Sequence, residues 1–174
     1  MKRTVLVFGL VAGLIVSAYM DFSMARFYQT QELKNGMIYG YAAMIIAFSF
    51  VFVGIKSYRD KYCGGVITFG RAFKTGLFIT LVASTIYVIT WLILLYGFMP
   101  DFMDRYAEHM INEAKAAGAT AAQLTAKAKE VKVYQDLYKN PLFVVLFTYL
   151  EILPVGLVIT AISALILKQK AARL

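Results

Sequence analysis

The feature that most constrains this fold is Pro141–Leu167, an apolar segment with a single charged residue, Glu151. The segment is longer than the roughly 20 residues that cross a hydrocarbon core as a helix. At 1.5 Å per residue, Glu151 lies about 15 Å along that helix, near the middle of a bilayer. A carboxylate at this depth must face protein or water, so we expect the other segments to pack around it.

Three further apolar runs contain no charged residue: Thr4–Met20, Met37–Ile55 and Leu77–Met99. The chain is 60% hydrophobic, against about 45–50% in soluble domains. Because the runs lack period-two alternation, they predict helices and not strands. The predicted fold is all-α: a four-helix transmembrane bundle in one membrane domain over 1–174, with spans at about 4–20, 37–55, 77–99 and 141–167.

The net charge of +8 raises the question of nucleic-acid binding. Most lysines and arginines flank the apolar runs, where they anchor helices and meet anionic lipid, and they form no contiguous basic face. We therefore predict the lipid bilayer as a partner and no nucleic acid. The single cysteine, Cys63, excludes an internal disulfide and a cysteine-rich metal site.

The amino terminus allows two interpretations. Lys2 and Arg3, an apolar core and Val16-Ser17-Ala18 resemble a secretory signal with a cleavage site. In the favoured alternative the first helix is retained, because Gly9, Gly13 and Ser17 give it a small-residue face suited to close packing. Mass spectrometry of the membrane-extracted protein decides between them, since cleavage predicts a mature start at Tyr19.

Basic residues are densest in the short segments on one predicted side of the membrane. The positive-inside rule then places both termini and the second loop in the cytoplasm. The residues concerned are Lys2, Arg3, Lys56, Arg59, Lys61, Arg71, Lys74, Lys168, Lys170 and Arg173.

Between the spans, Asp21–Asn35 is predicted as a short outside loop, and Val66–Gly76 as an amphipathic lead-in to the third span. In the lead-in, Arg71 and Lys74 share a face and are candidate lipid-headgroup contacts. A more specific anion or headgroup site there remains open. Further small-residue faces are predicted at Gly40, Ala43 and Ala47, and at Gly156, Thr160 and Ala164.

The third span carries a polar stripe at spacings of three and four residues, which form one helix face. The stripe consists of Thr80, Ser84, Tyr87 and Trp91. By depth, Tyr87, Thr90 and Trp91 are the candidate hydrogen-bond partners of Glu151, and Pro154 should kink the last helix beside it. The candidate intramembrane polar site is therefore Glu151, Tyr87, Thr90, Trp91 and Pro154.

Residues 101–140 are predicted as an extramembrane helical hairpin between the third and fourth spans. Its signals are an N-cap at Asp101, a helix end at Gly118, a capping box at Thr120 and Gln123, and Asn140 before Pro141. His109, the only histidine, is expected to be a lone surface residue. We predict no catalytic residues, no metal site and no cofactor, since the sequence lacks the usual motifs.

Four segments together resemble the bacterial domain-of-unknown-function 4199 family: Gly54–Asp60, Thr68–Gly76, Tyr138–Pro141 and Glu151–Gly156. Thr68 and Ile152 depart from the commonest family residues without affecting the topology. The resemblance implies a multi-pass protein of the bacterial inner membrane. It implies no activity, and no catalytic residues transfer.

Two functions remain open. The favoured one is a non-enzymatic scaffold or regulatory component that acts on a protein partner through the 101–140 hairpin or the basic 56–76 loop. The alternative is a small transporter or channel subunit that uses Glu151 and forms homo-oligomers. The carboxyl group would take part in proton or cation coupling in the second case, and would cross-link helices by hydrogen bonds in a purely structural role.

Overall fold

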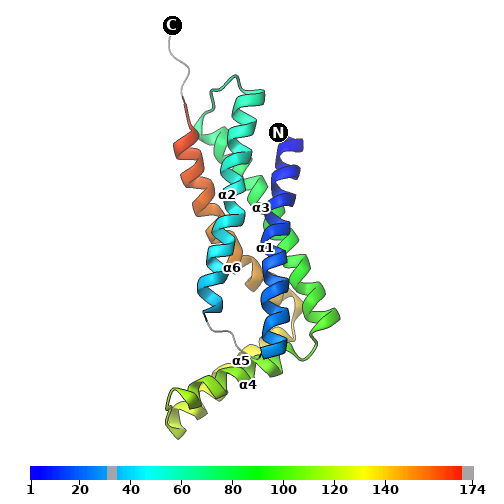
Figure 1. The fold of residues 1–174 in the computed structure, drawn as a ribbon, viewed down its shortest axis with the longest axis vertical. Coiled ribbons are helices and arrows are strands. Elements are labelled where there is room, and N and C mark those ends of the chain that lie inside the picture. The colour runs from blue at the N-terminus through cyan, green and yellow to red at the C-terminus, as the bar shows by residue number, and fades with distance from the viewer. Residues whose placement is uncertain (31–34, 170–174) are drawn as a thin grey trace.

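The structure, a computed structural model, describes residues 1–30 and 35–169. This part of the chain is all-helical, without strands, as predicted (Figure 1). The helices are α1 (Lys2–Thr30), α2 (Gly36–Tyr62), α3 (Phe69–Ile93), the π-helical turn η1 (Leu94–Phe98), α4 (Phe102–Ala116), α5 (Ala121–Tyr138) and α6 (Pro141–Leu167).

Four of these segments are long and apolar enough to cross a membrane: α1, α2, α3 with η1, and α6. Large apolar side chains on their outer faces are exposed, for example Leu14 at 62%, Ile46 at 62% and Ile166 at 65%. A water-soluble bundle would bury such faces, whereas hydrocarbon solvates them. The chain is therefore a helical membrane protein, and α6 has the predicted bounds.

The predicted loop at Asp21–Asn35 is wrong for most of its length, because α1 continues to Thr30. Phe27 explains the extension: it is 1% exposed, and its ring packs edge-on against those of Phe102 and His109. Residues 31–34 of that loop lie outside the described residues. The helix does not end where the apolar run ends, because the tertiary contacts of Phe27 stabilise its extension.

The expected amphipathic lead-in at Val66–Gly76 is helical only from Phe69 on, with Arg71 and Lys74 exposed and Ala72 buried. The helix that begins at Phe69 runs without interruption into the span, and the Thr68 side chain caps it by accepting from the Arg71 N–H at 3.4 Å. No break separates an interfacial segment from the rest of α3, which places Arg71 and Lys74 in its first two turns.

Small residues set the helix contacts at two of the three predicted faces. A Cβ on Gly9 or Gly13 would lie under 3 Å from Val82 or Ile86 of α3, so α1 and α3 approach closely there. On α6, Gly156, Thr160 and Ala164 are all buried. The face on α2 is wrong: Ala47 is buried, but nothing lies within 4 Å of a Cβ built on Gly40.

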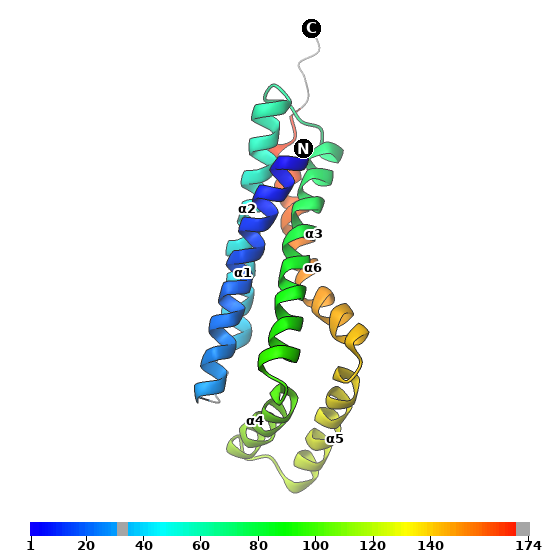
Figure 2. The ribbon, with the colours of Figure 1, turned by 90° about the vertical axis from the view of Figure 1, so that its right-hand side faces the viewer.

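The polar stripe of α3 faces the bundle interior as predicted, since Thr80, Ser84, Tyr87 and Trp91 are all at most 8% exposed. Thr80 shares a hydrogen bond with Thr160 of α6, with 2.9 Å between the two hydroxyl oxygens. Lower down, the N-terminal part of α6, which precedes Pro154, diverges from α3 (Figure 2).

Both ends of the described chain and the α2–α3 connection lie at the same end of the bundle (Figure 1). The Gln169 N–H donates to the Ile67 carbonyl at 2.9 Å and fixes the end of α6 to that connection. The described basic residues of the termini and the second loop therefore gather at this end. Lys34, Lys170 and Arg173 lie outside the described residues.

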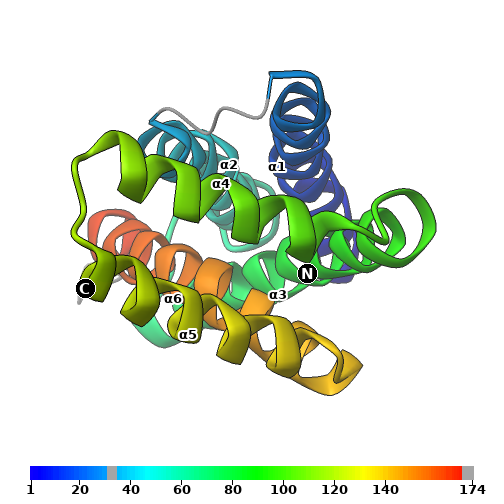
Figure 3. The same cartoon turned by 90° about the horizontal axis from the view of Figure 1, so that it is seen from below.

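At the opposite end, α4 and α5 lie beneath the bundle (Figure 3). Their connection turns at Gly118, whose φ of +80° suits glycine. Thr120 and Gln123 form the predicted capping box, and the Asn140 side chain accepts from the Leu142 N–H at 3.0 Å. Asp101 precedes α4 as expected, but its carboxylate does not cap the helix.

Candidate functional site

A partly open pocket of about 770 Å³ lies where α4 and α5 meet the lower end of the bundle. Side chains from α1 to α6 line it. The divergence of α6 below Pro154 separates its first turns from α3, and α4 and α5 border the space that results (Figure 2). Its volume falls within the range of pockets that hold small molecules in proteins.

Three of the five predicted site residues line this one pocket: Glu151, Tyr87 and Trp91. Tyr87 and Trp91 are each 8% exposed, whereas Glu151 is an exposed residue that borders the pocket beside the buried Thr148. The expectation that the other segments pack around Glu151 is therefore corrected: it lies at the edge of the pocket and not in the bundle core. Within residues 1–30 and 35–169, the structure gives none of these three side chains a hydrogen bond, so the prediction that Tyr87 and Trp91 are hydrogen-bond partners of Glu151 is wrong. A carboxylate, a phenol and an indole N–H are thus open to an occupant.

The other predicted residues lie elsewhere. The Thr90 hydroxyl donates to the Ile86 carbonyl of its own helix at 2.9 Å, and Thr90 does not line the pocket. Pro154 is exposed within α6. Arg71 and Lys74 are exposed at the opposite end of α3, where an Arg71 nitrogen approaches the Cys63 sulfur at 4.0 Å. Whether these residues bind lipid or ligand stays a prediction.

His109 was expected to be a surface residue, but the structure places it at the pocket. Its side chain is 17% exposed, lines the pocket and packs edge-on against the Phe27 ring at 5.7 Å. Its Nε2 lies 4.0 Å from a Glu113 carboxylate oxygen. His109 and Met110 lie three and four residues after Tyr106, and three and four residues before Glu113 come Met110 and His109, so the helical period was the signal that the four share a face.

The pocket walls are aromatic and sulfur-rich. Four residues from α3, α4 and α5 bring tyrosine rings to the lining: Tyr87, Tyr106, Tyr134 and Tyr138. Six of the eight methionines in the chain also line it: Met20, Met24, Met37, Met44, Met103 and Met110. Methionine is flexible and polarisable, so such walls adapt to ligands of different shape.

Charge is distributed unevenly over the lining. The described lining residues include the carboxylates of Glu113, Glu130 and Glu151 but no lysine or arginine. The chain as a whole has 18 basic and 10 acidic residues. The pocket is therefore an acidic site within a basic protein.

Burial raises the pKa of two pocket tyrosines, Tyr138 of α5 and Tyr106 of α4. It raises the pKa of Tyr138 to about 12, and the Glu151 carboxylate adds to this effect. Burial likewise raises the pKa of Tyr106. Both phenols retain their protons at neutral pH, so they present O–H donors and uncharged aromatic faces to the pocket.

Hydrogen bonds of Asp101 with Tyr28 and Arg105 join α1 to the start of α4 beside the pocket. The Tyr28 hydroxyl donates to Asp101 Oδ1 at 2.8 Å, and Arg105 Nε donates to Asp101 Oδ2 at 2.6 Å. The Arg105 guanidinium also lies 4.6 Å from the centre of the Tyr28 ring. Hydrogen bonds from Arg105 and then Tyr28 hold the pKa of Asp101 below its usual value.

Replacing Asp101 by asparagine should lower the melting temperature of the purified protein at neutral pH. Asparagine lacks the negative charge that the hydrogen bonds from Arg105 and Tyr28 stabilise. Because the pKa of Asp101 is lower in the folded state than the unfolded value of 3.8, its carboxylate stabilises the protein at pH values above 3.8. This stabilisation is lost as the pH falls through the folded-state pKa. The difference between wild type and D101N should therefore disappear in strong acid. Thermal unfolding at several pH values measures it, and D21N, a change at an exposed aspartate of α1, is the control. Equal melting temperatures of wild type and D101N at pH 7 would contradict the proposed role of these hydrogen bonds.

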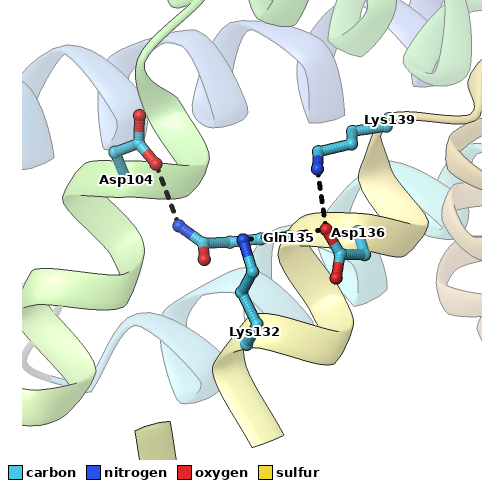
Figure 4. Close-up of polar contacts among 5 residues, drawn as sticks. All are labelled: Asp104, Lys132, Gln135, Asp136 and Lys139. Carbon is cyan, nitrogen blue, oxygen red and sulfur yellow. Dashed lines mark hydrogen bonds and ion pairs between the residues drawn. The ribbon is translucent and has the colours of Figure 1, made fainter. Parts of the chain in front are cut away.

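The two lower helices are held together by polar contacts as well as by packing. Gln135 Nε2 of α5 donates to Asp104 Oδ1 of α4 at 2.9 Å (Figure 4). On α5, Lys139 Nζ lies 2.7 Å from Asp136 Oδ1, and Lys132 Nζ lies 3.8 Å from the same oxygen. These lysines hold the pKa of Asp136 below its usual value, chiefly through the Lys139 hydrogen bond.

Comparison with known proteins identifies the family of this chain. Residues 7–169 match the family described as Protein of unknown function (DUF4199). The chain belongs to the DUF4199 family. The family match spans nearly the whole chain, from α1 to the end of α6, and confirms the resemblance found in the sequence. No curated protein and no solved structure matches this DUF4199 protein.

Proposed function

We propose that this protein is a non-enzymatic, solute-binding component of the bacterial inner membrane, with the pocket above α4 and α5 as its binding site. The observation that carries the proposal is the convergence of Glu151, Tyr87 and Trp91, whose polar atoms have no partner among the described residues, on one pocket of about 770 Å³. Such a pocket, largely apolar with a few convergent polar groups, is typical of small-molecule sites. A single chain provides all of its described lining.

In this proposal both termini and the α2–α3 connection face the cytoplasm, and the α4–α5 pair is an extramembrane hairpin on the opposite side. The gathering of described basic residues at the end of the bundle where both ends of the described chain lie supports this orientation. The pocket would then open toward the extracytoplasmic side, and its solute would arrive from there or from the outer leaflet. A transporter or channel subunit is the form of this function that places Glu151 on the solute path.

A scaffold or regulatory role through α4 and α5, or through the basic 56–76 loop, is the second candidate. The exposed charged residues of α4 and α5, among them Glu108, Lys115 and Lys132, favour it as a surface for a protein partner. Crosslinking in native membranes distinguishes the candidates: a heterologous protein linked through α4 or α5 favours the scaffold.

Filling the pocket should abolish solute binding. Nothing lies within 4 Å of a Cβ built on Gly40, which lines the pocket, so Gly40→Phe can place a ring there without disturbing the helix packing. Native mass spectrometry of protein extracted from its own membrane should show a bound small molecule in wild type and none in G40F. Gly70→Phe, at an equally open position of α3 outside the pocket, is the matched control and should retain the molecule. Equal occupancy in G40F and wild type would refute the proposal.

A further inference from the structure

The chemistry of the pocket lining indicates what kind of solute it selects. We propose that the pocket binds an organic monocation with apolar substituents, with Glu151 as its counter-ion; this inference rests on the proposed function and specifies its ligand. Three features carry it: an unpaired carboxylate inside a candidate span, tyrosine and tryptophan rings around it, and flexible methionine walls.

The first argument is electrostatic. Glu151 lies in a candidate membrane span, where an uncompensated carboxylate is costly, and no described side chain pairs with it. Among the described lining residues, no lysine or arginine could compete with a ligand cation or attract an anion. A bound cation provides the opposite charge that the protein itself does not supply.

The second argument concerns the aromatic rings. The faces of tryptophan and tyrosine attract cations that approach within about 6 Å of the ring centre. Trp91 and Tyr87 enter the pocket from α3, and Tyr106, Tyr134 and Tyr138 from α4 and α5. Aromatic rings therefore come from both sides of the site that contains Glu151. A strongly hydrated metal ion would gain little from such walls, whereas an organic cation gains from both charge and apolar contact.

The third argument separates this site from a lipid-filled crevice. A phospholipid acyl chain needs only apolar walls, and a phosphate group would be repelled by Glu113 and Glu151, whereas the charge of Glu130 is offset by Lys127 Nζ at 3.1 Å. The acidic lining therefore favours a cation over an anionic lipid. Phospholipid remains the occupant that the experiment below must distinguish.

Tetraphenylphosphonium and tetraphenylborate are suitable probes because they have nearly the same shape and opposite charge, and triphenylphosphine oxide is a neutral relative. Equilibrium dialysis of the full-length protein in a non-ionic detergent measures the binding of each. Trp91, the only tryptophan in the chain, lines the pocket and reports occupancy through its fluorescence. We expect the cation to bind at least tenfold more tightly than the anion.

Glu151→Gln keeps the size and polarity of the side chain and removes its charge, so it should weaken tetraphenylphosphonium binding about tenfold or more. The matched control is Glu108→Gln, an exposed position of α4 outside the pocket, which should change binding less than twofold. The neutral probe should bind E151Q and wild type equally. The circular dichroism of E151Q must match wild type, which shows that the change is not a folding defect.

The outcomes separate this inference from the proposed function. If all three probes bind equally, are unaffected by E151Q and are displaced by Gly40→Phe, the pocket is a solute site but the cation preference is wrong. Co-purification of a phospholipid that occupies the pocket and is lost in G40F would likewise show that the pocket binds a ligand but does not prefer a cation. If no probe binds, or G40F displaces none of them, both proposals fail.

Discussion

Replacing Phe102 by alanine should lower the free energy of unfolding by about 3–5 kcal/mol, the cost of removing a buried aromatic side chain. Phe102 is 8% exposed, and its ring lies edge-on to Trp91 at 5.0 Å and against Phe27 at 6.2 Å. It also stacks on Tyr106 at 6.0 Å. This one side chain therefore joins α4 to α1 and α3 at the edge of the pocket.

Two measurements report the loss locally. Trp91 fluorescence should shift to longer wavelength, because water reaches the indole once the Phe102 ring is gone. Amides of α4 should exchange hydrogen faster, since the helix loses its anchor to the bundle. Phe98→Ala is the matched control: Phe98 lies four residues away and is 73% exposed, so its removal should change neither signal nor stability appreciably. An unchanged Trp91 spectrum in F102A would show that α4 is not anchored by this ring.

The second large effect is expected at Gly156, where α6 approaches α3 and α2. A Cβ on Gly156 would clash with the Thr80 side chain, and would lie 2.9 Å from the Phe48 ring. Gly156→Leu must push the helices apart, at a cost of about 3 kcal/mol from overpacking and the weakened Thr80–Thr160 hydrogen bond. Denaturant titration followed by circular dichroism measures this loss, and gel filtration should show aggregated material.

The control for Gly156 is Gly70→Leu, because nothing lies within 4 Å of a Cβ at Gly70. That variant should remain within about 0.5 kcal/mol of wild type, as surface changes usually do. Gly156→Ala should fall between the two, since it adds the clashing Cβ without the rest of the side chain. A G156L protein as stable as G70L would mean that α3 and α6 do not approach closely at this point.

Local signals predicted local structure well. The bounds of α6, the capping box at Thr120 and Gln123, and the turn at Gly118 each depend on backbone chemistry within a few residues. The buried stripe of α3 followed from helical spacing alone. Helix ends were predicted less well: α1 continues to Thr30 because Phe27 packs against residues more than 70 positions away.

The candidate site was predicted in part. Depth along two antiparallel helices placed Tyr87 and Trp91 near Glu151, and the structure puts all three at one pocket. Thr90 was included on depth alone, but its hydroxyl bonds to its own helix backbone. His109, Glu113 and Glu130 were missed because the sequence does not show how α4 and α5 lie against the bundle.

The sequence by itself determined that this is an all-helical protein with four segments long and apolar enough to cross a membrane, and with one carboxylate inside the last of them, because hydrophobic length and helical period are properties of single segments. Only the tertiary structure decided which side chains share a pocket with that carboxylate. A pocket forms from contacts between six helices, and their relative placement depends on packing between residues far apart in the chain.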